Sequence, residues 1–304
     1  MRDRSGIMSS MNRLSTKQRE RVVSALVEGN SIRATCRMTG VAKDTVTKLL
    51  TDLGVVCSIY QDRVMRDLPC ERIQCDEIWS FVGMKQKNVP AEKQGEFGYG
   101  DVWTWVAIDA DSKLVPSYRV GSRDIGDAHE FIADLAKRLS NRVQLTTDGL
   151  RVYLSAVERA FDGEIDYAQL VKIYGSEGKP GRYSPPICLG AVPEAITGNP
   201  DGAHISTSYV ERQNLTMRMS MRRFTRLTNA FSKKVENLAA AVSLHFMHYN
   251  FCRPHKTLEG ATPAMAAGLS DHVWSLSELI ALLEDAESYP TKRGSYKKRA
   301  AISN

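Results

Sequence analysis

Three acidic residues stand where the sequence gives a carboxylate an unusual setting. Asp76 lies inside an apolar stretch, Asp148 ends a short apolar run, and Glu211 is the one acid among seven Arg and Lys between Gly202 and Val235. Two or three carboxylates can hold a pair of Mg²⁺ ions about 3.5–4 Å apart, which activate the attacking oxygen and stabilise the leaving oxygen of a phosphodiester. If these acids converge, they predict metal-assisted phosphodiester cleavage, with neighbouring arginines holding the nucleic-acid backbone.

Each acid also has a structural explanation. Asp148 precedes a glycine and fits an ordinary turn, and Ser208 and Glu211 have the spacing of a capping box. Asp76 is harder to explain, because an unpaired carboxylate inside an apolar strand is costly. Glu77 is expected on the opposite face of that strand, since strand side chains alternate. The metal-site hypothesis therefore depends on the three acids meeting in space.

The elements that must position these acids follow from periodicity. Strand-like composition occurs at 71–85, 102–110, 111–122, 142–148 and 164–175. Helical spacing predicts one helix capped by Asp124, a second over 150–161, and a later helix that carries Glu211. Three consecutive strands followed by alternating helices and strands predict an α/β mixed sheet with helices on its faces.

A small all-α module is expected ahead of the sheet, over residues 1–56. Ser15 with Gln18 fits a capping box, Ser31 can cap a second helix, and a turn at Gly40 leads into a third. This third helix has apolar residues at i, i+3, i+4 and i+7, namely Val46, Leu49, Leu50 and Leu53. Short helix, glycine turn and helix are typical of a helix-turn-helix. The alternative is a three-helix packing module that does not bind DNA.

The predicted DNA contacts come from two regions. In a helix-turn-helix the first residues of the second helix lie near base edges, which here gives Lys43, Thr45, Thr47 and Lys48. A second set follows Glu211 and comprises Arg212, Arg218 and Arg222. Arg218 lies seven residues beyond Glu211, and therefore on the same helical face.

Charge supports a polyanionic partner. The net charge is +6, and residues 1–50 hold 10 basic and 4 acidic side chains. Residues 288–304 hold five basic and no acidic side chains. Together with the segment around Glu211 these regions predict binding to double-stranded DNA, because phosphate contacts dominate nucleic-acid affinity. A merely solvated tail is the alternative for the last 17 residues.

Other sequence features limit the class of protein to which the chain can belong. The 304 residues contain no apolar run of about 18, and the N-terminus lacks the apolar stretch of a secretory signal, so a cytoplasmic protein without membrane contact is expected. The six cysteines form no C-x-x-C pair and are expected to be reduced structural thiols. A partial metal site at Cys57, Cys70 and Cys75 is the weaker alternative.

Three blocks together resemble a known family. CDEIWSF with Asp76, LTTDGL with Asp148 and SYVERQN with Glu211 are similar to the signature blocks of DDE transposases of bacterial insertion sequences, nearest to the founding insertion-sequence-one family. The segment HFMHYNFCRPHKTLEGATPAMAAGL, residues 245–269, resembles the part that follows the Glu block in such enzymes. The resemblance covers about residues 70–269.

The resemblance implies a ribonuclease H-like core with Asp76, Asp148 and Glu211 as the metal-binding, catalytic triad. It implies Mg²⁺, with Mn²⁺ as a substitute, cleavage at the ends of a mobile element, strand transfer into target DNA, and a homo-oligomer working on DNA. The corresponding location is the bacterial cytoplasm, where the protein would associate with the nucleoid when it is bound to DNA. Arg218 matches a basic position that related enzymes often carry seven residues after the Glu.

The resulting domain prediction has four parts: a helix-turn-helix module (1–56), a linker (57–70), a ribonuclease H-like catalytic domain (71–269), and a C-terminal helix with a basic tail (270–304). Asp148 and Glu211 are 63 positions apart (211 − 148), more than in compact members of the family. The Gly- and Pro-rich segment 175–202 is therefore expected to be an insertion. No zinc-ribbon cysteine pattern is found, although some relatives begin with one.

Two other functions remain compatible with these residues. One is a metal nuclease of the same fold that cuts without joining. The other is a helix-turn-helix regulator in which the acids are structural. The sequence favours an enzyme, because a regulator needs no carboxylates spread over three blocks.

The front module yields the first testable prediction. Lys48→Ala should weaken DNA binding and lower the slope of log K against log salt by about one, because one phosphate contact is lost. The measurement is a salt titration of binding to duplex DNA. No change in affinity or slope would favour the packing-only module.

Overall fold

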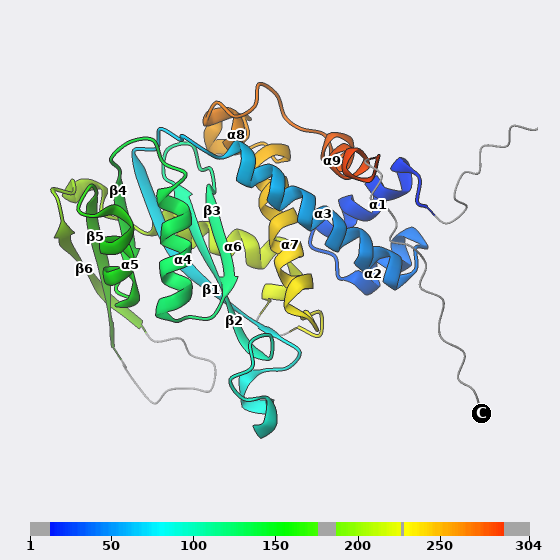
Figure 1. The fold of residues 1–304 in the computed structure, drawn as a ribbon, viewed down its shortest axis with the longest axis horizontal. Coiled ribbons are helices and arrows are strands. Elements are labelled where there is room, and N and C mark those ends of the chain that lie inside the picture. Colours follow the sequence, from blue (N-terminus) through cyan, green and yellow to red (C-terminus); the bar gives the residue numbers. More distant parts are fainter. Residues whose placement is uncertain (1–12, 176–186, 226–227, 289–304) are drawn as a thin grey trace, which may run out of the picture.

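A six-stranded mixed sheet forms the centre of the fold. The computed structural model describes residues 13–175, 187–225 and 228–288 (Figure 1). The strands are β1 (Arg72–Val82), β2 (Gly100–Asp109), β3 (Ser117–Gly121), β4 (Gln144–Asp148), β5 (Asp166–Gly175) and β6 (Ile187–Thr197). Their spatial order is β3-β2-β1-β4-β5-β6.

Strand direction defines the class of the fold. β1, β2 and β3 pair antiparallel, β4 and β5 continue parallel to β1, and β6 returns antiparallel to β5. Three meander strands followed by two parallel strands on the other side of β1 are the ribonuclease H-like arrangement. The α/β class predicted from the sequence is confirmed.

Helices cover both faces of this sheet. On one face lie α4 (Ile125–Ala136) and α5 (Val152–Phe161), where Phe131 and Tyr153 contact the ring of Trp105. The other face carries α6 (Ser208–Ser220) and α7 (Val235–Met247), and α7 packs its Phe246 on Tyr118 of β3. Figure 1 shows α4 in front of the sheet and α6 and α7 beside its centre. As expected, Asp124 caps α4 through its side chain.

The helical module contains α1 (Thr16–Val27), α2 (Ile32–Thr39) and the start of α3 (Lys43–Val64). Ser15 and Gln18 form the predicted capping box, and Ser31 accepts a hydrogen bond from the third residue after it. Gly40 ends α2 in the left-handed region, with φ 72°, which glycine adopts at little cost. The three predicted helices and the predicted caps at Ser15 and Ser31 are therefore present, while the role of these helices in DNA binding stays a prediction.

The linker predicted over 57–70 is wrong for its first half. α3 continues to Val64 and packs along α7. Its buried stripe runs on through Leu53, Cys57 and Gln61, and Gln61 donates hydrogen bonds to the carbonyls of Cys57 and Ser243. A polar residue inside this stripe hides the helical period in the sequence. A single long helix thus joins the module to the sheet domain.

The C-terminal region packs back on the front module. α9 (Leu276–Ser288) lies against α1 and α3, and Glu287 pairs with the buried guanidinium of Arg19 at 3.0 Å. Figure 1 shows α9 next to α1, although the two are far apart in sequence. The predicted C-terminal helix is therefore present, whereas the basic tail lies outside the described residues.

The segment predicted as an insertion, 175–202, contains regular structure. Its residues 187–197 form β6, which extends the sheet beyond β5. The described residues also contain shorter elements: η1 (Gln86–Asn88), η2 (Ala91–Lys93), η3 (Gly202–His204), η4 (Arg222–Phe224), the π-helical η5 (His248–Cys252), η6 (Lys256–Leu258) and α8 (Pro263–Ala266). Within the described part of the chain, every helix is too short or too polar to cross a membrane.

The close contact between α3 and α7 gives a stability prediction. A Cβ atom added at Gly54 would lie 2.4 Å from the Cα atom of Ala240, so Gly54→Ala should destabilise the fold by about 1–3 kcal/mol through overpacking. The measurement is chemical denaturation. Gly126→Ala in α4 is the matched control, because its added Cβ would lie at an ordinary 3.4 Å from the nearest atom. Equal stability of the two variants would contradict the prediction.

Candidate active site

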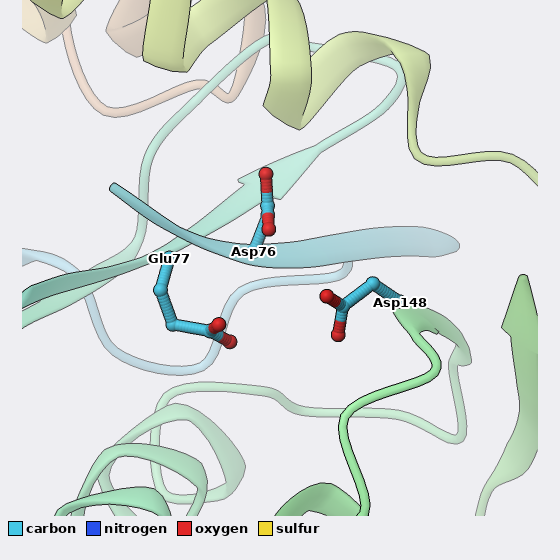
Figure 2. A group of neighbouring side chains, drawn as sticks. All are labelled: Asp76, Glu77 and Asp148. Carbon is cyan, nitrogen blue, oxygen red and sulfur yellow. The ribbon is translucent and has the colours of Figure 1, made fainter. Parts of the chain in front are cut away.

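Strand register brings two of the predicted acids together. β1 and β4 run parallel, and their last paired residues are Cys75 and Thr147. The next residue on each strand is an aspartate, Asp76 on β1 and Asp148 at the end of β4. Oxygens of Asp76, Asp148 and Glu77 lie within 4.8 Å of one another (Figure 2). We refer to these three residues as the acidic cluster.

Glu77 is the member of the cluster that is expected on the other face of β1. Figure 2 shows that Asp76 and Glu77 do leave β1 on opposite sides, as alternation requires. The carboxylate of Glu77 nevertheless approaches that of Asp148, because β4 ends at this point and leaves the flank of β1 open. The expected direction of Glu77 is therefore confirmed, while its carboxylate still joins the cluster. The adjacent Asp-Glu pair was the signal in the sequence.

Arg123 connects two carboxylates of the cluster. Its Nε donates to Glu77 Oε2 at 3.0 Å, and its Nη2 lies 3.8 Å from Asp148 Oδ2. The guanidinium also lies over the ring of Trp103, 4.7 Å from its centroid. This stacking fixes the direction of the guanidinium, so one positive charge partly offsets the cluster.

The charges of the cluster repel each other inside the protein. Burial, followed by the charge of Asp148, raises the pKa of Asp76 to about 6. The same two causes raise the pKa of Glu77 to about 7, although Arg123 opposes the shift. Carboxylates that resist ionisation in this way are short of positive charge, and a divalent cation among them would supply it.

Asp148 serves the turn as well as the cluster. Its Oδ1 accepts a hydrogen bond from the backbone N–H of Leu150 at 3.0 Å, which is the turn chemistry predicted as the alternative. Gln169 on β5 donates to the carbonyls of Asp148 and Leu150 at 3.0 and 3.3 Å. The turn is thereby fixed, and Asp148 Oδ2 remains on the side of the cluster.

Glu211 lies in the first turn of α6 and outside the acidic cluster. Its carboxylate accepts a hydrogen bond from Thr207 Oγ1 at 2.5 Å and forms an ion pair with Lys172 of β5. The charge of Glu211 still acts on Asp76, whose pKa it helps to raise. The convergence of all three predicted acids thus stays a prediction, with Glu211 nearby but paired elsewhere.

The capping-box alternative for Glu211 is wrong. Ser208 is the first residue of α6 and Thr207 is its N-cap, so the predicted spacing is displaced by one residue. The side chain of Thr207 makes no hydrogen bond to the backbone amides of the helix. Glu211 therefore does not act as the reciprocal partner of a capping serine.

α6 also provides a residue that the sequence analysis missed. Asn214 follows Glu211 by three positions, and its Nδ2 donates to Asp76 Oδ2 at 2.9 Å. Its i, i+3 spacing from Glu211 was the available signal. Without knowledge of how α6 lies on β1, that spacing had no partner in the sequence.

Most of the predicted DNA contacts fall around one cavity. A cavity of about 1150 Å³ lies between α2, the start of α3 and the segment that joins α6 to α7. We call it the basic cavity, because its lining includes Arg33, Arg37, Lys43, Lys48, Arg222, Arg223, Lys233 and Lys234. Among the described residues that line it, Asp44 is the single acid.

The basic cavity includes Lys43, Thr47, Lys48 and Arg222 of the predicted DNA contacts. Thr45, Arg212 and Arg218 are not among its lining residues. Thr45 is partly buried on α3, Arg212 is exposed on α6, and Arg218 is partly buried on the same helix.

Arg223 adds a partly desolvated positive charge to this cavity. Burial lowers its pKa to about 10, and its Nη1 donates to Ser232 Oγ at 2.5 Å. A guanidinium that is desolvated and bonded to a hydroxyl favours an anionic partner, because burial of a positive charge is costly.

The acidic cluster suits a divalent metal ion with oxygen ligands. Asp76 and Asp148 offer carboxylate oxygens from two rigid strands, and Mg²⁺ prefers such ligands together with water. All six cysteines are free, and Cys57, Cys70 and Cys75 are buried. Burial raises the pKa of each of these three thiols, which disfavours the thiolate form that binds a metal.

Comparisons with known proteins return matches among solved structures. Neither family models nor curated proteins match this sequence. A piggyBac transposase synaptic complex with hairpin DNA is 11% identical, with 96% of this chain and 77% of that chain covered and a TM-score of 0.41. The Mos1 mariner paired end complex with Mn is 9% identical, with 94% and 83% covered and a TM-score of 0.32.

The Mos1 strand transfer complex is 13% identical, with 54% of this chain and 60% of that chain covered and a TM-score of 0.23. Similarity at this level does not identify a function. The class that the chain's own fold and site define is a ribonuclease H-like α/β protein with an acidic cluster at the junction of β1 and β4.

Burial of the Asp76 carboxylate and its repulsion by Asp148 predict a stability gain from Asp76→Asn in the presence of a chelator. The folded-state pKa of Asp76 is raised, so ionisation of this group costs stability as pH rises from its ordinary value of 3.8 through about 6. The neutral variant avoids this cost and should be more stable above pH 6, by roughly 1–3 kcal/mol.

This advantage should shrink as pH falls and disappear below about 4, where Asp76 is protonated in both the folded and the unfolded protein. The measurement is the free energy of unfolding of both proteins from pH 4 to pH 8. A variant that is less stable than the wild type at pH 8 would show that neither burial nor repulsion makes the ionised Asp76 destabilising.

Proposed function

We propose that this protein is a DDE-type transposase that cleaves DNA at the ends of an insertion sequence and joins the ends to target DNA. The observation that carries the proposal is the register of β1 and β4, which places Asp76 beside Asp148 on a ribonuclease H-like sheet. The three sequence blocks that resemble those of the insertion-sequence-one family support it, and so does the basic cavity.

In this proposal Asp76, Asp148 and Glu211 are the metal ligands. Mg²⁺ bound there, or Mn²⁺ in its place, would activate the attacking oxygen and stabilise the leaving oxygen of a phosphodiester. Asp76 and Asp148 are already adjacent. Glu211 would have to exchange its contact with Lys172 for the cluster through a change of rotamer.

DNA would approach from the side of the helical module. Lys43, Thr47 and Lys48 on α3 and Arg222 beyond α6 line the same basic cavity, so one duplex could meet both parts of the chain. Arg212 and Arg218 are carried on α6 together with Glu211, which suits contacts to the backbone near the cleaved bond. Thr45 remains a proposed contact next to these residues.

The proposed activity also has consequences for assembly and location. A transposase acts on two element ends, so a homo-oligomer on DNA is expected. A bacterial enzyme with a chromosomal substrate would work in the cytoplasm, in association with the nucleoid.

The acidic cluster argues against a regulator. A DNA-binding regulator gains nothing from three mutually repelling carboxylates, two of them with raised pKa values. A metal nuclease without joining activity shares the site and therefore remains the second candidate. The two enzymes differ only in what attacks the target strand.

The carboxylates are tested by Asp76→Asn. With Mg²⁺ present, cleavage of element-end DNA should fall by at least about 10³-fold, because one ligand of the metal site is lost, whereas DNA binding should survive. Asp162→Asn is the matched control, since Asp162 ends α5 in the left-handed region that asparagine also adopts. Cleavage by Asp76→Asn at the wild-type rate would refute the metal-site proposal.

A joining assay separates transposase from nuclease. Purified protein, Mg²⁺, labelled element ends and a supercoiled plasmid are incubated together, and covalent strand-transfer products are sought on a denaturing gel. A transposase forms these products through the freed 3′-hydroxyl, and a nuclease releases only cut ends.

A further inference from the structure

Helix α6 receives its N-terminal cap from another element. Its own N-cap residue, Thr207, makes no side-chain bond to the helix amides. Gln74 of β1 supplies the acceptor: its Oε1 receives hydrogen bonds from the backbone N–H groups of Tyr209 and Val210, at 2.8 and 3.2 Å. Gln74 is 4% exposed, so this contact is protected from water. A strand side chain thereby fixes the start of the helix that carries Glu211.

A second polar contact joins the same two elements. Asn214 on α6 donates from Nδ2 to Asp76 Oδ2 at 2.9 Å, and Asn214 is 7% exposed. Its Oδ1 is buried and receives no hydrogen bond from the described residues. An amide left half-satisfied in this way is costly, so packing alone does not explain the residue.

The two contacts join one face of β1 to one side of α6. Gln74 and Asp76 are two residues apart on β1 and therefore project from the same face of the strand. On α6, Asn214 lies one turn beyond Glu211 and on the same side. α6 is held to β1 at both points, and Glu211 lies between them along the helix.

Apolar packing would suffice to hold α6 on the sheet. Val210 and Met217 are both fully buried on this helix. Apolar contacts are non-directional, however, and allow a helix to slide or rotate slightly. The two hydrogen bonds add direction, which a site with ligands from separate elements requires.

We propose that Gln74 and Asn214 are positioning residues of the active site. Gln74 sets the start of α6 on β1, and Asn214 fixes α6 to Asp76 while orienting that carboxylate. Together they set the distance from which Glu211 can reach Asp76 and Asp148. This role rests on the proposed function, because it concerns the same metal ligands.

The role of Gln74 is tested by hydrogen exchange. Gln74→Met keeps the approximate size of the side chain and removes the acceptor, so the amides of Tyr209 and Val210 should exchange about five- to tenfold faster. Gln74→Glu restores an acceptor beside a helix N-terminus and should restore slow exchange. Unchanged exchange in Gln74→Met would overturn the role of Gln74, and so would fast exchange in Gln74→Glu.

The role of Asn214 is tested by metal affinity, measured by calorimetric titration with Mn²⁺. Asn214→Leu removes the bond to Asp76 and should weaken Mn²⁺ binding about tenfold, the usual effect of losing a partner of a metal ligand. DNA cleavage should fall with it. Asn214→Ala removes the same donor and covers the case in which leucine does not fit.

Gln213→Leu is the matched control. Gln213 is the neighbouring residue on α6, is 2% exposed, and makes no hydrogen bond to the acidic cluster within the described structure. This variant should bind Mn²⁺ like the wild type. A purely structural role would make the Asn214 and Gln213 variants behave alike.

Different results of the Mn²⁺ titration would overturn the role of Asn214 and the proposed function. Wild-type affinity for Mn²⁺ in both Asn214 variants, beside a wild-type protein that binds the ion, overturns the role of Asn214 alone. A wild-type protein that binds no Mn²⁺ and cuts no DNA overturns the proposed function, and the role of Asn214 with it. The exchange experiment on Gln74 stays decisive in either case, because it needs no metal.

Discussion

The parallel pairing of β1 with β4 is the constraint on which the site depends. The pairing ends at Cys75 and Thr147, so the aspartates that follow must lie side by side. A slip of one residue would turn one of them to the other face of the sheet. The buried residues Ile73 and Leu145 are paired further back in the same ladder and oppose such a slip. The core of the sheet thus determines the geometry of the carboxylates.

Placing the carboxylates together lowers the stability of the folded protein, and the rest of the fold must offset this loss. Burial, followed by the charge of Asp148, raises the pKa of Asp76 and of Glu77, so joint ionisation is disfavoured, and Arg123 offsets only part of this cost. Strain of this kind is common where a protein prepares a binding site. One hydrophobic core runs along α3 from the helical module to α7. The stability of this core offsets the destabilising effect of the carboxylates.

The sequence was sufficient for the parts governed by local periodicity. It predicted all of the first five strands, the capping box at Ser15 and the helix capped by Asp124, because alternation and capping act between near neighbours. It failed where a contact came from a distant element. The polar Gln61 hid the continuation of α3, and Asn214 had no visible partner until α6 lay on β1. For Glu77 the direction was predicted correctly, but the reach of its carboxylate past the end of β4 was not.

We propose that Asp76 and Asp148 share divalent ions and that Glu211 joins them. The most direct measurement is anomalous diffraction from crystals grown with Mn²⁺. We expect an anomalous peak about 2 Å from oxygens of both Asp76 and Asp148, with Glu211 turned from Lys172 toward it. Ordered crystals with abundant Mn²⁺ and no peak between the two aspartates would contradict the account.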